Sequence, residues 1–516
     1  MAQPGLIALP LELLAGICSH LCWHCRGGHA NVTGHFEHGA ADTRGEPEPL
    51  VWSREEQAAL LNLGRTCRVL RAAAEPFLYH YLYTASPSDL YFLVRTLLER
   101  PDLGPRVSEV DLVHAGGVPG SALTAMDGLD SPSSEPLAQR ITESVKSHTA
   151  RMNTSGAATH LDPRPRYPSI FPGDSEDPIT EAEYSELVSL LLPLTPNLQR
   201  AHLRLPVWAY PSLETPPHPH CPLLTSLKVL AFSRLGPSFY VNRAAPILRL
   251  APNLEVLQCY DCARTTAEFR AALNCNEAPP PDSNPAQLMP LDNVVELHLT
   301  LLYKSSRPTE DYLYHLSKSI GPRLSKVTIR RTVVSRRHQE LEFHDTIRSL
   351  RHRSQTLREL SFYFTNLGQG LQDSLGPSTY FLGCEELRRA LTALEVLRTQ
   401  TVFVDHTGRQ RPSGKDAGLS SMLPLSLREL RLRGFQNRIT CLLEGLLEAV
   451  VAGEFRALSW VGIDEQGFQD EPVGADGEPG WAGATKLREV AAAFRAAGVE
   501  FVVLPPGPQV AGKSPG

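Results

Sequence analysis

The sequence lacks the features of several broad classes of protein. None of its stretches is long and apolar enough to span a bilayer, so we expect no membrane segment. Lysine and arginine number 50 against 56 acidic residues, and a net charge of −6 gives no electrostatic reason to expect nucleic acid as the main ligand. Ten cysteines are too few and too unevenly spaced in 516 residues for a disulfide framework, which favours a reducing compartment. We therefore expect a cytoplasmic or nuclear protein.

The N-terminal segment is apolar, but it also lacks the features of a signal peptide. It has no basic beginning, and Pro10 and Glu12 interrupt the apolar run. We expect this segment to remain part of the folded protein. Because 516 residues exceed what one hydrophobic core usually serves, we expect two or more units or a repeat array.

Familiar catalytic motifs are missing as well. The sequence has no G-x-S-x-G elbow, no H-E-x-x-H motif, no G-x-G-x-x-G after a strand and no EF-hand loop. Gly507–Ser514 fits the P-loop pattern, but a P-loop leads into a helix that holds the phosphates, and only Pro515 and Gly516 follow. We predict that the protein is not an enzyme and has no cofactor. An enzyme built in a groove stays an alternative, because catalytic groups meet in space and not in sequence.

The N-terminal residues predict a short helix. Pro10 stands where a helix can begin, because its missing N–H would be unpaired there in any case. After it, Leu13, Ile17 and Leu21 recur every fourth residue, with Leu14 beside them. One face of this helix is therefore expected to be apolar.

A second helical segment is expected after an insertion. Ser53–Glu56 form a capping-box pattern that predicts its start, and we expect it to end at Pro76, before an aromatic junction. Its apolar residues recur at helical spacing: Leu60, Leu61, Leu63, Cys67, Leu70 and Ala74. Short helices of this kind cannot bury so many apolar residues by themselves, which implies a partner or a neighbouring domain.

This region resembles an F-box. The similarity rests on two patterns, Leu9-Pro10-x-Glu12-Leu13-Leu14-x-x-Ile17-x-x-x-Leu21 and Leu63-x-x-Thr66-Cys67-x-x-Leu70-Arg71. The continuations Pro76–Tyr79 and Leu97–Leu103 are similar to segments that follow the box in many fungal F-box proteins. The resemblance covers roughly the first hundred residues, and its motif is moderately specific.

The resemblance implies a helical motif that docks on the Skp-type linker protein of an SCF ubiquitin ligase and, through it, on a cullin. The residues that it assigns to docking on the linker are Leu9, Pro10, Leu13, Ile17, Leu21 and Leu70. A Gly- and His-rich insertion at about 23–52 departs from the compact box. The alternative is that residues 9–76 form only a helical cap of the domain that follows.

The rest of the chain predicts an irregular repeat. The template is L-x-x-L-x-L, a short strand with alternating inward residues that is followed by a helix or loop. Its starts lie 27 to 40 residues apart, longer than in regular leucine-rich repeats. The matches are Leu198/Ala201/Leu203, Leu227/Leu230/Phe232, Leu254/Leu257/Cys259, Val294/Leu297/Leu299, Leu324/Val327/Ile329, Leu357/Leu360/Phe362, Leu394/Leu397/Thr399 and Leu427/Leu430/Leu432, with further strands near Ala457–Ile463 and Val499–Leu504.

The predicted fold class is therefore α/β. We expect a short all-helical F-box-like unit followed by an irregular leucine-rich-repeat-like α/β solenoid, and the alternative is a compact α/β domain with several Leu-rich strands. The expected boundaries are an F-box-like unit at 1–84, a connecting helix and first strand at 85–113, a disordered loop or linker at 114–180, the repeat domain at 181–506 and a disordered tail at 507–516.

Residues between the inward leucines should face away from the core, because side chains alternate along a strand. Glu296, Lys326 and Glu359 then occupy equivalent places in neighbouring strands and can attract one another. Arginine and tyrosine are enriched in binding hot spots. The residues that we predict to bind an acidic or phosphorylated target segment are Tyr260, Arg330, Tyr363, Arg398, Arg431 and Arg433, and the alternative is a solvated repeat face. The basic residues at 330–331 and 336–338 are expected to be a solvated repeat edge.

One cluster has ligand types suited to zinc. It is Cys22-x-x-Cys25-x-x-x-His29, with His35 or His38 as a fourth ligand. Because the two cysteines straddle the end of the predicted helix and the histidines follow too closely for a zinc finger, we favour a His-rich loop without metal.

The expected function is that of a substrate-recognition adaptor of an SCF-type ubiquitin ligase. In this interpretation the F-box-like segment binds the Skp-type linker and the repeat domain captures an unknown target protein. Catalysis then takes place elsewhere in the complex, and the adaptor contributes proximity. The alternative is a leucine-rich-repeat-like interaction scaffold with no link to ubiquitin.

Overall fold

The structure of the chain is a computed structural model that divides it into two units, the first ending at Leu254 and the second beginning at Glu255. It describes residues 9–22, 25, 48–84, 87–112, 181–206, 223–235, 245–263, 291–302, 313, 316–317, 320–333, 346–366, 384–400, 419–433, 439–464 and 482–504. The predicted linker at 114–180, the tail at 507–516 with its P-loop pattern, and the basic residues at 336–338 lie outside the described residues.

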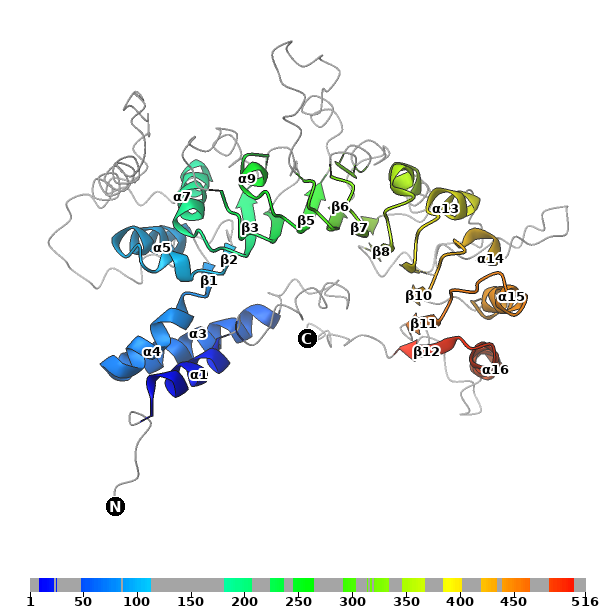
Figure 1. The fold of residues 1–516 in the computed structure, drawn as a ribbon, viewed down its shortest axis with the longest axis horizontal. Helices are drawn as coiled ribbons and strands as arrows, with labels where there is room; N and C mark the ends of the chain where they lie inside the picture. Colours follow the sequence, from blue (N-terminus) through cyan, green and yellow to red (C-terminus); the bar gives the residue numbers. More distant parts are fainter. Residues whose placement is uncertain are drawn as a thin grey trace, which may run out of the picture. The chain divides into compact units, whose positions relative to one another are not determined.

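Three helices at the start of the first unit pack around one small core (Figure 1). They are α1 (Leu11–Leu21), α3 (Glu48–Thr66) and α4 (Arg68–Leu78). Their fully buried residues are Leu14, Cys18, Cys22, Leu60, Leu70, Ala73 and Ala74. The helical periodicity of the sequence therefore places its apolar residues in a shared core, as expected for amphipathic helices.

The bounds of the second and third helices differ from the prediction. The α3 helix begins at Glu48, so that Pro49 lies in its first turn and Ser53 lies inside the helix, where it cannot cap it. An extended residue, Cys67, separates α3 from α4, and α4 continues through Pro76 to Leu78. The predicted capping box and the predicted end at Pro76 were wrong, because a proline close to the end of a helix removes one hydrogen bond without ending the helix.

Four parallel strands follow in the first unit and pair in chain order. The first of them, β1, was not predicted. Two helices, α5 and α7, pack against each other beside these strands (Figure 1). The elements are β1 (Tyr81–Thr84), α5 (Pro87–Glu99), the 3-10 turn η2 (Gly104–Arg106), β2 (Glu109–Leu112), α7 (Glu181–Leu194), β3 (Arg200–Pro206), β4 (Val229–Leu235) and α9 (Ala245–Leu250).

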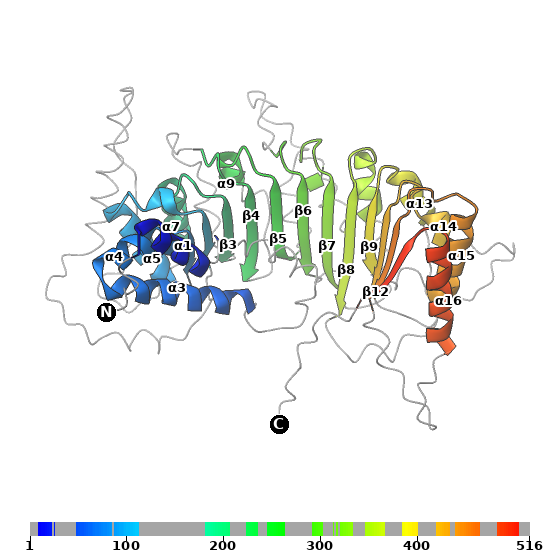
Figure 2. The same cartoon turned by 60° about the horizontal axis from the view of Figure 1, so that its bottom comes forward.

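In the described part of the second unit, eight parallel strands also pair in chain order (Figure 2). The helices α13 to α16 lie on one side of the later strands (Figure 1). The strands are β5 (Val256–Ala263), β6 (Glu296–Leu302), β7 (Lys326–Val333), β8 (Glu359–Asn366), β9 (Val396–Gln400), β10 (Glu429–Arg433), β11 (Trp460–Asp464) and β12 (Glu500–Leu504). The helices are the 3-10 turn η6 (Arg351–Arg353), α13 (Cys384–Ala390), α14 (Leu419–Met422), α15 (Ile439–Val451) and α16 (Ala482–Ala496).

The residues that lead into the strands repeat one local structure. In the second unit, the N–H of Val294 donates to the carbonyl of Leu291, and Leu394 and Leu458 make the same bond to the third residue before them. Two successive amides then share the carbonyl of the residue just before the preceding strand. The first apolar residue of the pattern is buried in each case: Leu198, Leu227, Leu254, Val294, Leu324, Leu357, Leu394 and Leu427.

The α/β fold class predicted from the sequence is confirmed. Each of the strands predicted between 198 and 504 is present, and all of them pair in parallel. The inward residues of the L-x-x-L-x-L pattern are buried, and their burial stabilises the fold. Within the described ranges, no helix combines the length and the apolar character needed to cross a membrane.

Candidate docking surface, strand face and metal-ligand cluster

The α1 helix carries more apolar residues than its own core uses. Leu14 and Cys18 lie one turn apart and are buried, whereas Leu13 and Ile17 lie one turn apart and are 56% and 39% exposed. Leu9, just before the helix, precedes Leu13 by four residues and is 37% exposed. Because residues four apart share a side of a helix, Leu13 and Ile17 form one exposed row on α1. Leu9 is exposed just before the helix, and we name these three residues the α1 stripe.

The backbone at the start of α1 holds this stripe in place. Pro10 is the residue before the helix, and its carbonyl accepts hydrogen bonds from the N–H groups of Leu13 and Leu14 at 3.0 and 3.1 Å. The bond from Leu14 is the first regular hydrogen bond of the helix, and the bond from Leu13 satisfies an amide that the first turn otherwise leaves without a partner. The prediction that a helix begins at this proline is confirmed.

The six residues that the F-box resemblance assigns to docking do not all lie on this surface. Leu70 is 5% exposed and belongs to the core of the three helices, so it supports the surface from within and offers no area to a partner. Leu21 is partly buried against the same core. Leu61 and Val69, which the resemblance did not single out, are 40% and 43% exposed. Exposed apolar side chains therefore occur on all three helices.

The strand face of the second unit carries a row of alternating charge. Lys326 Nζ lies 3.5 Å from a carboxylate oxygen of Glu296 and 3.6 Å from one of Glu359. The three residues are register partners on β6, β7 and β8, so the predicted row is confirmed. Arg398 on β9 continues the row, because its guanidinium lies 2.5 Å from Glu359 and 3.2 Å from Glu429 on β10. We name this row the charge ladder.

One carboxylate of the ladder has a shifted pKa. A hydrogen bond from His298, with an N–O distance of 3.2 Å, lowers the pKa of Glu296 below its usual value, and the neighbouring Lys326 acts in the same direction. Burial opposes both effects without cancelling them. Glu296 is therefore held in its ionised form by the groups around it.

The residues predicted to bind an acidic target have different surroundings from those we expected. Arg398 is mostly buried and already pairs with two carboxylates, so an acidic ligand would have to compete with Glu359 and Glu429 for it. Tyr363 is 5% exposed and offers almost no surface. Arg330 and Arg431 lie half-buried on β7 and β10. The side chains of Tyr260 and Arg433 lie outside the described part of the chain, although their backbones belong to β5 and β10.

The same strand face has a tryptophan that the sequence did not single out. Trp460 on β11 is half-buried, and its indole lies directly over Gly462. A Cβ atom at Gly462 would stand 1.9 Å from Cη2 of the indole, so glycine is what permits this close approach.

A polar cluster lies on the strands of the first unit. His202 Nδ1 on β3 is 3.0 Å from a carboxylate oxygen of Asp111 on β2, and the hydroxyl of Tyr81 on β1 donates to the other oxygen at 3.5 Å. Asp111 and Tyr81 are both buried. The cluster gives an aspartate buried in the sheet two polar partners, which burial of a carboxylate requires.

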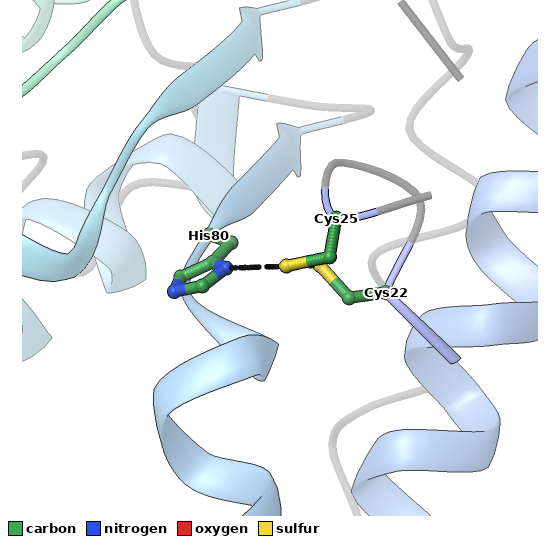
Figure 3. Close-up of side chains that lie close together, drawn as sticks. All are labelled: Cys22, Cys25 and His80. Atoms are coloured by element: carbon green, nitrogen blue, oxygen red, sulfur yellow. Dashed lines mark hydrogen bonds between the residues drawn. The ribbon is translucent and has the colours of Figure 1, made fainter. Parts of the chain in front are cut away.

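Two cysteines and a histidine gather beside the end of α1 (Figure 3). The Nδ1 atom of His80 lies 3.2 Å from Sγ of Cys25 and 3.9 Å from Sγ of Cys22. Burial lowers the pKa of His80, with a smaller contribution from Arg106, so the imidazole is neutral at neutral pH. Among the described residues, this is the group of His, Cys, Asp and Glu side chains whose ligand atoms are close enough to hold a metal ion. His29, the histidine suggested by the sequence spacing, lies outside the described residues, as do His35 and His38.

No protein-family model matches the sequence, and no curated protein is significantly similar to it. The function therefore has to be argued from the surfaces themselves.

Proposed function

We propose that the protein is a substrate-recognition adaptor of an SCF-type cullin ubiquitin ligase. The observation that carries the proposal is the α1 stripe, an apolar surface that stays exposed while the opposite side of the same helix is sealed in a core. The stripe consists of residues that the F-box resemblance assigns to docking on a Skp-type linker. An exposed row of large apolar side chains on a folded helical unit is a feature of interaction surfaces.

Burial of the α1 stripe by a partner would contribute a substantial part of the free energy of binding. Full burial of a leucine or isoleucine side chain contributes about 1.5–3 kcal/mol. Because Leu13 and Ile17 are 56% and 39% exposed, burial of their remaining surface contributes about 1.5–3 kcal/mol in total. Replacing both by aspartate removes this contribution and adds charges to the interface, which weakens binding by about tenfold or more.

The second part of the proposal concerns the strands after α5. We infer a leucine-rich-repeat-like solenoid in which each repeat contributes one strand, and in which the strand face captures the target protein. The recurring hydrogen bonds before the strands and the buried leucines at equivalent positions support this inference. The charged residues of the ladder pair largely with one another, so the target protein would bind to the residues around the ladder.

The test is co-expression of the full chain with a Skp-type linker, followed by size-exclusion chromatography. We expect a one-to-one complex that is lost in the double variant Leu13→Asp/Ile17→Asp. The matched control is Leu425→Asp/Val451→Asp, which changes two exposed apolar residues of the second unit, 48% and 72% exposed, and should leave the complex intact.

Two results would count against the proposal. The folded wild-type chain could fail to bind the linker, which would make an interaction scaffold without a ubiquitin link the leading function. Alternatively, the double variant could bind as well as the control, which would remove the α1 stripe as the docking surface. Far-UV circular dichroism of each variant establishes that it is folded.

A further inference from the structure

We propose that Cys22, Cys25 and His80 bind one Zn²⁺ ion through Sγ, Sγ and Nδ1. The three ligand atoms lie within 4.8 Å of one another, and two of the residues are Cys22 and Cys25 of a C-x-x-C pair (Figure 3). Sequence spacing offered His29 as the third ligand. The fold supplies His80 instead, 55 residues after Cys25.

The two Sγ–Nδ1 distances are close to those of a tetrahedral zinc site. With Zn–S bonds of about 2.3 Å and a Zn–N bond of about 2.05 Å, sulfur and nitrogen ligands stand about 3.6 Å apart and two sulfurs about 3.8 Å apart. The Sγ–Nδ1 distances of 3.2 and 3.9 Å lie on either side of that value. Binding of a zinc ion would therefore change these two Sγ–Nδ1 distances by about 0.3–0.4 Å.

The backbone around each ligand holds it in place. Cys22 follows the last turn of α1 and is buried in the core of the three helices. His80 lies in the turn between α4 and β1, and its carbonyl accepts hydrogen bonds from the N–H groups of Ser108 and Glu109 at 3.1 and 2.9 Å. Its imidazole packs edge-on against Phe77, with ring centroids 5.2 Å apart. Two of the three ligands are thus fixed before any ion binds.

The chemistry of the ligands favours zinc over harder ions. Thiolates and imidazole suit zinc, whereas calcium and magnesium prefer oxygen ligands. On binding, each thiol forms a Zn–S bond and gives its proton to the solvent, so that one Zn²⁺ displaces two protons, and the neutral imidazole contributes a lone pair without losing a proton. Within the described residues no fourth His, Cys, Asp or Glu joins the group, and water can complete the tetrahedron.

The ion would connect two parts of the first unit. Cys22 and Cys25 come from the end of α1, whereas His80 comes from the start of the strands. Binding to the folded state alone raises stability by mass action, so a chelator should lower the unfolding temperature. The proposal does not depend on a ubiquitin ligase, because it concerns metal binding by this chain alone.

The test uses the full chain, purified under reducing conditions without a His tag, loaded with zinc, desalted and analysed by mass spectrometry for metal content. We expect about one zinc per wild-type chain and less than about a tenth of an equivalent in Cys25→Ser and in His80→Asn. The controls are Cys67→Ser and His20→Asn, which lie outside the cluster and should keep about one equivalent.

Cobalt substitution of the wild type gives a second readout that does not depend on any variant folding. Thiolate ligation produces a sulfur-to-cobalt charge-transfer band, which zinc should abolish by competition. The proposal is overturned if the wild type keeps no zinc and shows no such band, or if Cys25→Ser and His80→Asn hold as much zinc as the controls. A Cys22–Cys25 disulfide that persists in protein purified under reducing conditions, seen as the loss of two hydrogen masses, would also overturn it.

Discussion

Arg353 connects the segment before β8 to the segment before β7 by hydrogen bonds to backbone carbonyls. Its replacement should therefore destabilise the second unit. Its guanidinium donates to the carbonyl of Ser317 at 2.6 and 3.2 Å, to that of Gly321 at 3.0 Å, and to that of Ile320. Arg353 itself belongs to η6, the turn before β8, whereas its three acceptors precede β7. A single side chain therefore satisfies three carbonyls that precede β7 and connects them to the turn before β8.

The magnitude follows from the number and the kind of these bonds. A hydrogen bond from a charged donor contributes about 1.5–3 kcal/mol. Burial opposes part of this gain and lowers the pKa of Arg353, although an arginine stays protonated at neutral pH. Because the bonds share one guanidinium, their contributions do not simply add. We expect Arg353→Met to lower the free energy of unfolding by about 2–4 kcal/mol.

Urea unfolding followed by far-UV circular dichroism measures this change, with Arg351→Met as the control. Arg351 lies two residues away in the same turn, but its side chain is exposed. Arg353→Lys should fall between the two, because an ammonium group cannot reproduce the planar fork that reaches three carbonyls. Equal unfolding midpoints for Arg353→Met and Arg351→Met would refute the reasoning.

Two further changes test the strand face. Because the pKa of Glu296 is lowered in the folded state, its stabilising effect should be fully present above its usual pKa of 4.5 and be lost as the pH falls through the lower folded value. Glu296→Gln should therefore lower the urea concentration at the unfolding midpoint at neutral pH and change it little in strong acid. An equal effect at the two pH values would show that the charge of Glu296 does not stabilise the fold. Gly462→Ala should displace the indole of Trp460, costing about 1–3 kcal/mol and shifting its fluorescence, whereas Gly445→Ala, which has open space around it, should cause neither change.

The strands after residue 180 could be predicted from the sequence because their pattern is local. An L-x-x-L-x-L segment identifies its own inward residues, and parallel strands in register place equivalent residues side by side. This is why Glu296, Lys326 and Glu359 were predicted to meet. The strand β1 was missed because two of its four residues, Tyr81–Thr84, are aromatic and it begins three residues after the end of α4.

Arg398 shows where register reasoning stops. Its register partners are Ser361 and Arg431, which suggested a basic row open to an acidic ligand. The guanidinium instead reaches diagonally to Glu359 and Glu429, on either side of Val396. The strand register fixes the position of a Cβ atom. A long charged side chain can extend several ångströms from that position to pair with an opposite charge, and the register does not determine which one. Sequence alone could therefore predict the strand and the face, but not the partner.

The cluster of Cys22, Cys25 and His80 could not be predicted for a related reason. Spacing rules detect ligands that are close in sequence, and here the third ligand comes from the turn after α4. Only the packing of α1 against α3 and α4 brings that turn to the end of α1.

The α1 helix is the element on which both proposals meet. One side of it contributes Leu14 and Cys18 to the core, the other exposes the α1 stripe, and Cys22 follows its last turn. An exposed apolar surface binds a partner best when the helix that carries it is held rigidly, because less order has to be gained on binding. If zinc holds the end of α1, chelation should weaken linker binding without any change to the stripe itself. Loss of zinc and loss of Leu13 and Ile17 would then affect one interface by two separate physical routes, the first through its rigidity and the second through its apolar area.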